Sequence, residues 1–350
     1  MLSILELLFA AMVIIFVLPR GVIVPVSDDI DNEIPTIERV YLPSTLNPDY
    51  ATTIHAVKKL NRSLTTTGFV IIHLDNAPSL DPTSTLHTLR SLATDFFTSS
   101  MDEKLKYNFG PYGNPSGGYT PMGVENVGST SGDEETGKDL VENYVYRTNP
   151  LTSNEDTKTS NRHPRELTDV VGEYFGKMDS LCSILNRMTA MAFGLDLDYF
   201  NDFFFPGPNG NSLRIAHYPP QSESSDNRIR YGAHTDYQTF TILSPSPTDD
   251  LEGYGGLEVL VGEEWVKVES RGGLVVNAGD LWVDWTGGRW KSGMHRVTNP
   301  TTERGRGEGR LSIPFFTGPR PKTVVGDVWG EGKGVEAGEH LRRKLEKSNG

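Results

Sequence analysis

The stretch "GAHTDYQTFTIL", residues 232–243, decides how the rest of the chain is interpreted. It places His234 and Asp236 two residues apart in a run rich in Thr, Phe, Ile and Leu, which favours a β-strand. Side chains at positions i and i+2 of a strand point to the same face. The imidazole and the carboxylate are therefore either two ligands of a metal with a third ligand elsewhere, or two unrelated polar residues on a surface strand.

A third ligand is available in the C-terminal half of the chain. The other histidines there are His217, His295 and His340. His340 lies in the charged helical segment "GEHLRRKLEK", whereas His295 opens the strand-like run "HRVTNP", with 58 residues between Asp236 and it. Two histidines and one carboxylate leave three coordination positions open, which suits Fe(II) that binds a cosubstrate and O2. The predicted metal ligands are His234, Asp236 and His295.

The run "RLSIPFF" adds a candidate site for an anion. Arg310 and Ser312 share a strand face by the same i, i+2 rule. Arginine grips a carboxylate through two parallel hydrogen bonds, and the serine hydroxyl adds another. A buried arginine without an anion is costly, so Arg310 binds either a cosubstrate carboxylate or an internal acid. Tyr218, in "AHYPP", could supply a phenolic donor to the same anion.

Composition limits the remaining choices. The 350 residues are 36% hydrophobic, enough for a sizeable core, and the net charge of −13 argues against a nucleic-acid partner. The single cysteine, Cys182, excludes an intrachain disulfide and a multi-thiolate zinc site, and is expected to be a buried apolar residue. Absence of paired cysteines favours a reducing compartment. We therefore expect a cytoplasmic protein that acts as a monomer.

The N-terminal segment "MLSILELLFAAMVIIFVLPRG" is apolar from Leu7 to Leu18. That run is shorter than the roughly 20 residues that span a bilayer, although counting from Leu2 it comes close. It also lacks the positive start and the small-residue cleavage site of a secretory signal. Residues 1–33 are thus a membrane anchor through residues 2–18, a weak signal peptide, or an extension outside the fold. Membrane contact through this segment stays an open alternative.

From about Ile34 the pattern becomes that of a globular protein. Strands are expected at "IPTIERVYLP" and "FVIIHL", and helices at "DYATTIHAVKKLNRSLTTTG", "TSTLHTLRSLATDFF" and from about Arg165 to Phe193. Residues 110–137 hold eleven Gly and Pro and predict a long irregular segment. Short β-like runs then follow, separated by turn residues as in an antiparallel sandwich or barrel. They are "LRIAHY", "TFTIL", "LEVLV", "WVKVE", "LVVNAGDLWVDW", "HRVTNP" and "RLSIPFF".

The chain resembles the iron(II)- and 2-oxoglutarate-dependent oxygenases of the isopenicillin N synthase-like family. The resemblance covers roughly residues 34–320 in the family's order. The matching pieces are "GFVIIHLDNAP", "FFTSSMDEKLKY", "GGYTPMGVE", "LRIAHYPP", "GAHTDYQTFTIL", "GGLEVL", "LVVNAGDLWVDWTGGRWKSGMHRVTNP" and "RLSIPFF".

The resemblance implies an α+β fold with a double-stranded β-helix (jelly-roll) core and flanking helices. It assigns the three predicted ligands to Fe(II) and places Arg310, Ser312 and Tyr218 around 2-oxoglutarate. The implied reaction uses O2 to oxidise a small organic metabolite by hydroxylation, desaturation or ring formation, and it releases succinate and CO2. A role in secondary metabolism is a family-based expectation.

The same interpretation divides the chain into five regions. Residues 1–33 are the apolar extension, 34–150 the N-terminal dioxygenase region and 151–204 the support helices. Residues 205–320 are the Fe(II)/2-oxoglutarate jelly-roll domain, and 321–350 form a charged C-terminal tail.

Two features depart from the family pattern. Ala216 stands where many plant members have Asn, which changes the pocket wall beside the metal. The segment "TTERGRGEG" lengthens the connection before Arg310 and predicts an extended hairpin loop, which costs little because loop closure depends weakly on length.

The substrate pocket is the least determined part of the site. Candidates for its wall are Tyr119, His217 and Trp285, with Trp282 beside them; core packing is the alternative for each aromatic residue. His217 alternates away from Tyr218 on a strand, so a structural role is the favoured interpretation for it.

Three other functions remain as alternatives. An oxidative cyclase of the isopenicillin N synthase type needs iron and O2 but no 2-oxo acid, and it brings a C-terminal glutamine near the iron. No Gln follows Gln238 in this chain, which favours the 2-oxoglutarate-dependent interpretation. A catalytically inactive jelly-roll binder would have no physical need for both the triad and the Arg310/Ser312 pair. A cupin-like zinc or structural protein on the same fold is the third alternative, which the identity of the bound metal would test.

Overall fold

The structure is a computed structural model, and it describes residues 36–108, 117–128, 138–147, 164–221, 230–329 and 334–349. The apolar segment 1–33 lies outside the described residues, so its three interpretations stay untested. Within the described ranges, no helix is both long and apolar enough to cross a bilayer.

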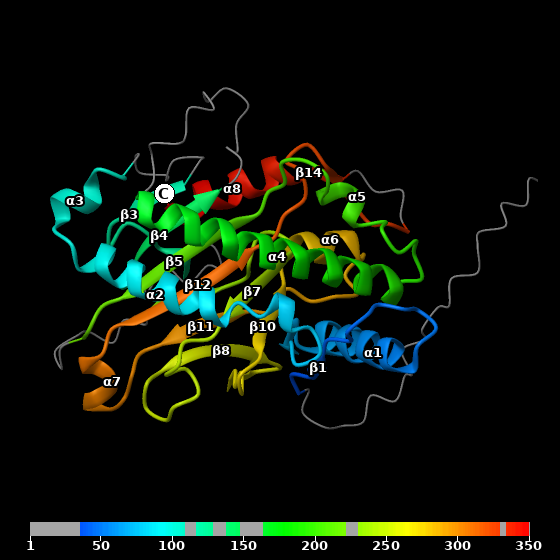
Figure 1. The fold of residues 1–350 in the computed structure, drawn as a ribbon, viewed down its shortest axis with the longest axis horizontal. Coiled ribbons are helices and arrows are strands. Elements are labelled where there is room, and N and C mark those ends of the chain that lie inside the picture. Colours follow the sequence, from blue (N-terminus) through cyan, green and yellow to red (C-terminus); the bar gives the residue numbers. More distant parts are fainter. Residues whose placement is uncertain are drawn as a thin grey trace, which may run out of the picture.

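Two β-sheets form the centre of the molecule (Figure 1). In the larger sheet β1 pairs with β2 in parallel, and the other paired strands run antiparallel. Its order is β1 (Arg39–Tyr41), β2 (Phe69–His73), β10 (Leu274–Ala278), β7 (Phe240–Ser244), β12 (Arg310–Phe316), β5 (Ser212–Tyr218), β4 (Glu142–Arg147) and β3 (Gly117–Thr120). The smaller sheet has the order β6 (Tyr231–His234), β11 (His295–Thr298), β8 (Gly256–Val261) and β9 (Glu264–Lys267).

Helices cover one face of the larger sheet, with the long α4 lying across it (Figure 1). The helices that pack there are α1 (Ala51–Thr66), α2 (Thr83–Thr98) and α4 (Arg165–Ala192). The remaining short elements are η1 (Pro78–Leu80), α3 (Met101–Leu105), α5 (Asn201–Phe204), α6 (Asp280–Trp285), α7 (Glu303–Gly307), β13 (Val324–Val325), β14 (Val335–Glu336) and the C-terminal α8 (Ala337–Asn349).

Alternation along the strands explains why the larger sheet is buried on both faces. In β2, Val70 and Ile72 join the core beneath the helices, whereas Phe69 and Ile71 join a second apolar cluster with Val259 of β8. Successive side chains of a strand point to opposite faces, so one set meets the helices and the other meets the smaller sheet. The result is a mixed helix and sheet fold with a large, mainly antiparallel sheet and an enclosed space between two sheets.

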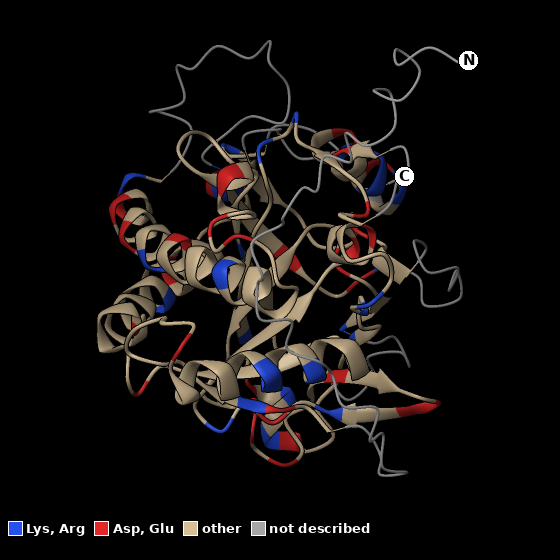
Figure 2. Ribbon diagram, turned by 90° about the vertical axis from the view of Figure 1, so that its right-hand side faces the viewer, with Lys and Arg blue, Asp and Glu red and all other residues tan. Residues whose placement is uncertain are grey.

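An ion pair attaches the helix α8 to the rest of the fold. Acidic and basic residues are interspersed along the helices and loops (Figure 2). The exposed pairs of Glu339 with Arg342 and Arg343 lie within α8 and contribute little to stability. Lys344 instead contacts Asp280 of α6, with Nζ to Oδ2 at 2.8 Å. This contact holds α8 at one edge of the space between the sheets.

Two local predictions from the sequence were wrong. The run "DLWVDW" forms the helix α6 rather than a strand, and it buries Leu281, Trp282 and Trp285 at helical spacing. An apolar run this short does not distinguish strand from helix. The segment predicted as an extended hairpin loop contains α7, whose first turn is capped by the Thr302 side chain accepting from the Gly305 N–H.

Candidate metal and cosubstrate site

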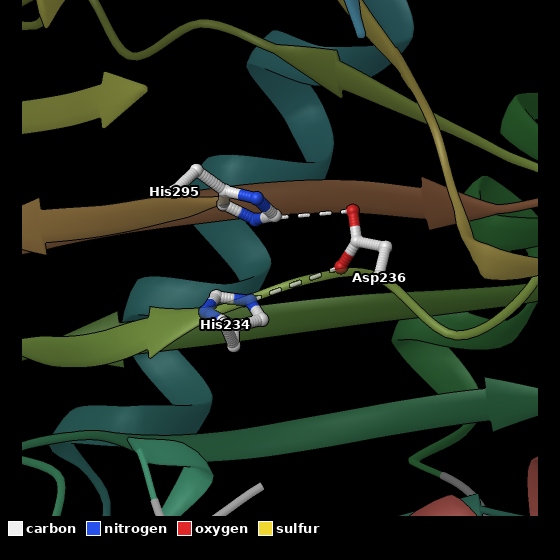
Figure 3. Close-up of side chains that lie close together, drawn as sticks. All are labelled: His234, Asp236 and His295. Atoms are coloured by element: carbon white, nitrogen blue, oxygen red, sulfur yellow. Dashed lines mark ion pairs between the residues drawn. The ribbon is translucent and has the colours of Figure 1, made fainter. Parts of the chain in front are cut away.

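His234, Asp236 and His295 meet between the two sheets (Figure 3). His234 ends β6 and His295 begins β11, and the two residues are direct partners in the antiparallel pairing of these strands. Nε2 of His234 lies 3.8 Å from Oδ1 of Asp236, and Nε2 of His295 lies 3.9 Å from Oδ2. One donor atom from each residue falls within 4.8 Å of the others, and all three side chains are buried. The structure thus brings the three predicted ligands together.

The element that carries Asp236 differs from the predicted one. The strand β6 ends at His234, and Asp236 lies in the loop after it, so the shared-strand-face argument was wrong for this residue. Thr241 and Asn277 fix the carboxylate instead, by donating hydrogen bonds of 2.6 and 2.7 Å to Oδ2. Carboxylate orientation therefore depends on β7 and β10, which the sequence spacing does not reveal.

The protonation states also fit a metal. The Nδ1 atoms of His234 and His295 lie 2.8 and 2.9 Å from the carbonyl oxygens of Gly232 and Gly293. Each Nδ1–H donates to its carbonyl, which leaves the Nε2 lone pair free toward the shared space. Burial and the neighbouring His295 lower the pKa of His234 to about 3. Two imidazole nitrogens and one carboxylate oxygen are the donor set of a non-haem iron site.

The three predicted cosubstrate residues lie on one cavity with the triad. Arg310 begins β12 and is the direct partner of Tyr218, which ends β5. Ser312 is two positions farther along β12, and all three residues line the cavity that the triad lines. The guanidinium carbon of Arg310 lies 5.4 Å from the centroid of the Tyr218 ring. The shared strand face predicted for Arg310 and Ser312 is present.

Arg310 has a partner that sequence reasoning missed. Its Nε donates to Oδ1 of Asp249 at 2.7 Å, and both side chains are buried. The internal acid considered from the sequence is therefore present, but it uses only one edge of the guanidinium. Nη1 of Arg310 is buried and has no hydrogen-bond partner in the described ranges. Asp249 lies in the turn "SPSPTDD", and a pair of acids in a turn gave no signal that distinguished it from solvated surface.

A second buried arginine near this position was also missed. Arg230 is 1% exposed, and within the described part of the chain its Nε and Nη2 have no hydrogen-bond partner. Its guanidinium carbon lies 5.9 Å from the ring centroid of Tyr218, the ring that Arg310 also approaches. Burial and the neighbouring Arg310 lower the pKa of Arg230 to about 10. Two arginines and Asp249 therefore leave an excess of positive charge at this end of the site.

The cavity itself has a volume of about 180 Å³. Alternate residues of the strands line it, since only one face of each strand points inward. Ala216 is among them, in agreement with the prediction that this position belongs to the pocket wall. From β5 the lining residues are Ser212, Arg214, Ala216 and Tyr218. The helix α8 closes one side with Leu341, Leu345 and Ser348.

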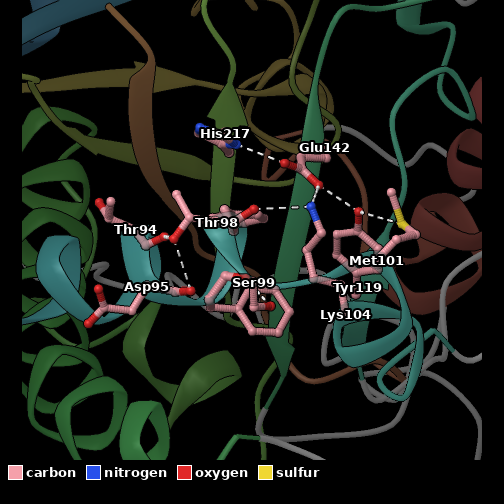
Figure 4. Close-up of polar contacts among 11 residues, drawn as sticks. Thr94, Asp95, Thr98, Ser99, Met101, Lys104, Tyr119, Glu142 and His217 are labelled. Atoms are coloured by element: carbon pink, nitrogen blue, oxygen red, sulfur yellow. Dashed lines mark hydrogen bonds and ion pairs between the residues drawn. The ribbon is translucent and has the colours of Figure 1, made fainter.

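Two of the residues proposed for the substrate pocket, Tyr119 and His217, lie in a buried network outside the cavity (Figure 4). Glu142 is its centre: Oε2 accepts from Tyr119 at 2.5 Å and from Lys104 at 2.8 Å, and Oε1 lies 2.8 Å from Nδ1 of His217. The His217 ring also stacks on Phe97 at the end of α2. The strand alternation that points Tyr218 inward points His217 toward the helices, as the structural interpretation predicted.

Trp285 and Trp282 are also absent from the described lining of the cavity. Both pack in the core beneath the helices against Phe200. Core packing was the alternative interpretation for these residues, and it is where the structure places them.

Asp139 fixes the backbone that positions His234. It accepts from the backbone N–H groups of Val127 and Gly232 at 2.8 and 3.0 Å, and the carbonyl of Gly232 holds His234. Burial raises the pKa of Asp139 from 3.8 to about 6. Because the folded-state pKa is the higher one, the contribution of this group is complete below about pH 4 and is lost as pH rises through about 6.

This loss predicts a specific pH dependence of stability. A pKa rise of this size corresponds to about 3 kcal/mol in total, of which about 2 kcal/mol falls between pH 4.5 and 7.5. Urea unfolding of wild type and Asp139→Asn at both pH values measures the effect, because other titrating groups cancel in the difference. Equal changes in the two proteins would show that Asp139 titrates normally in the fold.

Comparison with known proteins agrees with this arrangement. Residues 209–319 match the 2OG-Fe(II) oxygenase superfamily. The chain is 30% identical over 321 residues to the 2-oxoglutarate-Fe(II) type oxidoreductase ppzC of Metarhizium rileyi, and the match covers 84% of this chain and 79% of that protein.

Solved structures share the fold. A full-length Neurospora crassa protein in complex with alpha-KG and thymine has a TM-score of 0.72 at 24% identity, covering 91% of this chain and 98% of that protein. JOX2 in complex with 2OG, Fe and JA has a TM-score of 0.68 at 20% identity, covering 88% and 85%. The chain belongs to the 2OG-Fe(II) oxygenase superfamily, whose enzymes use Fe(II), 2-oxoglutarate and O2.

Proposed function

We propose that His234, Asp236 and His295 hold the Fe(II) of this oxygenase, and that Arg310 and Ser312 hold the distal carboxylate of 2-oxoglutarate. The enzyme then oxidises a small organic molecule and releases succinate and CO2. The observation that carries this proposal is the meeting of three buried donor atoms on the wall of the same cavity that Arg310 and Ser312 line. Held by these three side chains, Fe(II) would have coordination positions left for the 2-oxo acid and O2 and would supply the oxidising power.

The protein's part in the reaction is to hold the ligand side chains in position and to exclude water. The carbonyls of Gly232 and Gly293 keep both imidazoles in the tautomer that presents Nε2. The three ligand side chains are 6–8% exposed, so bulk water has little access to the reacting atoms. The rigid strands around them keep the donor set preorganised, which is worth more than an equivalent set on mobile loops.

Charge at the cosubstrate end supports the assignment of the distal carboxylate. Asp249 occupies Nε of Arg310 and leaves Nη1 without a hydrogen-bond partner among the described residues. Arg230 and Arg90 add two more cations near the same acid. An anion bound here would satisfy buried donors and offset the excess positive charge. The centroid of the Tyr218 ring lies 5.9 Å from the guanidinium carbon of Arg230 and 5.4 Å from that of Arg310.

The finer parts of the fold are also proposed. We infer that the two sheets form a double-stranded β-helix, because strands β5 to β12 of both sheets enclose one cavity that contains the triad. The five-region division of the chain, the monomeric state and the cytoplasmic location stay predictions. A small organic substrate is supported by the cavity volume and by the Neurospora crassa protein and JOX2, which were solved with thymine and with JA.

Anaerobic titration of the apo protein with Fe(II) and 2-oxoglutarate tests the proposal. A weak visible charge-transfer band is expected only when the 2-oxo acid chelates the iron, and its growth gives the affinity. Succinate release in air then identifies substrates from a set of small molecules. Iron binding without a band at any 2-oxoglutarate concentration would exclude the cosubstrate site and favour the oxidative cyclase. Zinc in place of iron should block turnover, because Zn²⁺ has no redox chemistry. Preferred binding of zinc on anaerobic reconstitution, with no turnover when iron is supplied, would favour the cupin-like alternative.

A further inference from the structure

We propose that the cavity wall beside the triad recognises an uncharged amide group of the substrate, through Arg214 and Asn143. This inference rests on the proposed function, since it names the class of molecule that this oxygenase accepts. It concerns the part of the cavity lined by β4 and β5, where Ala216 separates Asn143 from Ser312 in the sheet.

A compact set of polar side chains forms this wall. Glu125 accepts from Nη2 of Arg214 at 2.7 Å through Oε2, and from Nδ2 of Asn143 at 2.9 Å through Oε1. Nη1 of Arg214 donates to the Tyr231 hydroxyl at 2.8 Å. We call these four residues the Glu125 clamp. All of them line the cavity.

The clamp lies close to the metal ligands. The ring of Tyr231 meets the ring of His234 edge to face, with centroids 4.9 Å apart. Asn143 of β4 is the direct partner of Ala216 on β5, and Ala216 is the direct partner of Ser312 on β12. A group bound by the clamp would therefore lie next to both the triad and the cosubstrate, and the small Ala216 side chain leaves room for it.

Two atoms of the clamp have no hydrogen-bond partner among the residues that the structure describes. Nε of Arg214 is a buried donor, and Oδ1 of Asn143 is a buried acceptor. Buried polar atoms in native proteins are nearly always hydrogen-bonded, so this pair marks the place of a bound group. The group must offer one acceptor, for Nε, and one donor, for Oδ1. A carbonyl and an N–H, as in an amide, supply both.

The charge of the clamp indicates that this group is neutral. Glu125 already pairs with the positive charge of Arg214, and both side chains are mostly buried. A substrate carboxylate would place a second anion beside Glu125, and an ammonium group would face Arg214. The cavity lining also includes apolar side chains, which suit the hydrocarbon part of a substrate. Among them are Val127, Val145, Leu341 and Leu345.

Three matched probes test the proposal in the anaerobic Fe(II)–2-oxoglutarate enzyme. They are 2-piperidone, its N-methyl derivative and cyclohexanecarboxylate, and a change in the charge-transfer band with probe concentration reports binding near the iron. We expect 2-piperidone to bind about tenfold more tightly than the N-methyl compound, because the donor to Asn143 is lost. The carboxylate is expected to bind more weakly than both. Tighter binding of the carboxylate would overturn the proposal and favour recognition by Arg147, which also lines the cavity.

Two variants separate recognition from a structural role. Asn143→Leu is expected to remove the preference for 2-piperidone over its N-methyl derivative. Glu125→Gln leaves the charge of Arg214 without its anion, so cyclohexanecarboxylate should gain about tenfold relative to 2-piperidone. Thr120→Val, on the same wall but outside the clamp, is the control and should change each affinity less than about twofold.

The outcomes distinguish this inference from the proposed function. If the band forms but none of the three probes alters it, the clamp does not bind the substrate and only this inference fails. If no band forms with 2-oxoglutarate, the proposed function fails first. Should Glu125→Gln not fold, the order of the three probes in wild type still decides the matter.

Discussion

The variant His295→Ala is expected to bind Fe(II) at least about 100-fold more weakly than wild type, since each protein ligand of a metal contributes several kcal/mol. His295 supplies one of three donor atoms, and the pairing of β11 with β6 sets its position opposite His234. No other histidine or cysteine of the described residues joins this cluster to replace it. Anaerobic calorimetric titration with Fe(II) measures the loss.

A control of the same chemistry is His55→Ala, which removes an exposed histidine of α1. It should leave iron affinity unchanged. A third variant, Asn277→Leu, tests the carboxylate support and should weaken iron binding by about 10–100-fold, because Asn277 orients Asp236 without reaching the metal. Iron affinity of His295→Ala within about threefold of wild type would show that the metal site lies elsewhere.

The second large effect is expected at Arg310, and the structure shows why a single substitution would mislead. Arg310→Met removes the partner of the buried Asp249 carboxylate, which should destabilise the fold by about 3–5 kcal/mol. It should also lower 2-oxoglutarate affinity by about 30-fold or more, because a buried charged hydrogen bond to the distal carboxylate is lost. A drop in activity alone would not separate these two causes.

The double variant Arg310→Met/Asp249→Leu does separate them. Replacing both charges by apolar side chains should restore most of the stability, as measured by urea unfolding. Affinity for 2-oxoglutarate, read from the charge-transfer band, should stay low. Affinity for 2-oxopentanoate, which has no distal carboxylate, should equal that of wild type. Normal 2-oxoglutarate binding by the double variant would mean that another group, such as Arg230, holds the distal carboxylate.

Much of the scaffold was predictable because burial leaves a periodic pattern in the sequence. The helix expected from about Arg165 to Phe193 is α4, and the strands expected at "FVIIHL" and "TFTIL" are β2 and β7. The predicted helix and strand identities failed at "DLWVDW", where six residues satisfy either pattern. In such short runs the packing of the tryptophans in the core, rather than local sequence, selects the helix.

Residue types and their order were sufficient to select His234, Asp236, His295, Arg310 and Ser312 as candidates, because metal and carboxylate binding need particular donor atoms, and the structure places all five on one cavity. The relative positions of these side chains could be predicted only within one continuous strand, as for Arg310 and Ser312. Asp236 arrives from a loop, held by Thr241 and Asn277 of distant strands.

The substrate pocket shows most clearly what could not be predicted from the sequence. The sequence proposed Tyr119, His217 and Trp285, large side chains that pack outside a pocket equally well. The structure buries Tyr119 and Trp285 in the core and places His217 against Glu142 and Phe97. It was the tertiary structure that brought Glu125, Asn143 and Arg214 together from separate segments. By itself the sequence determined which chemistry the chain carries, because that depends on residue type. Only the tertiary structure decided what surrounds it, because contacts between distant strands leave no local pattern.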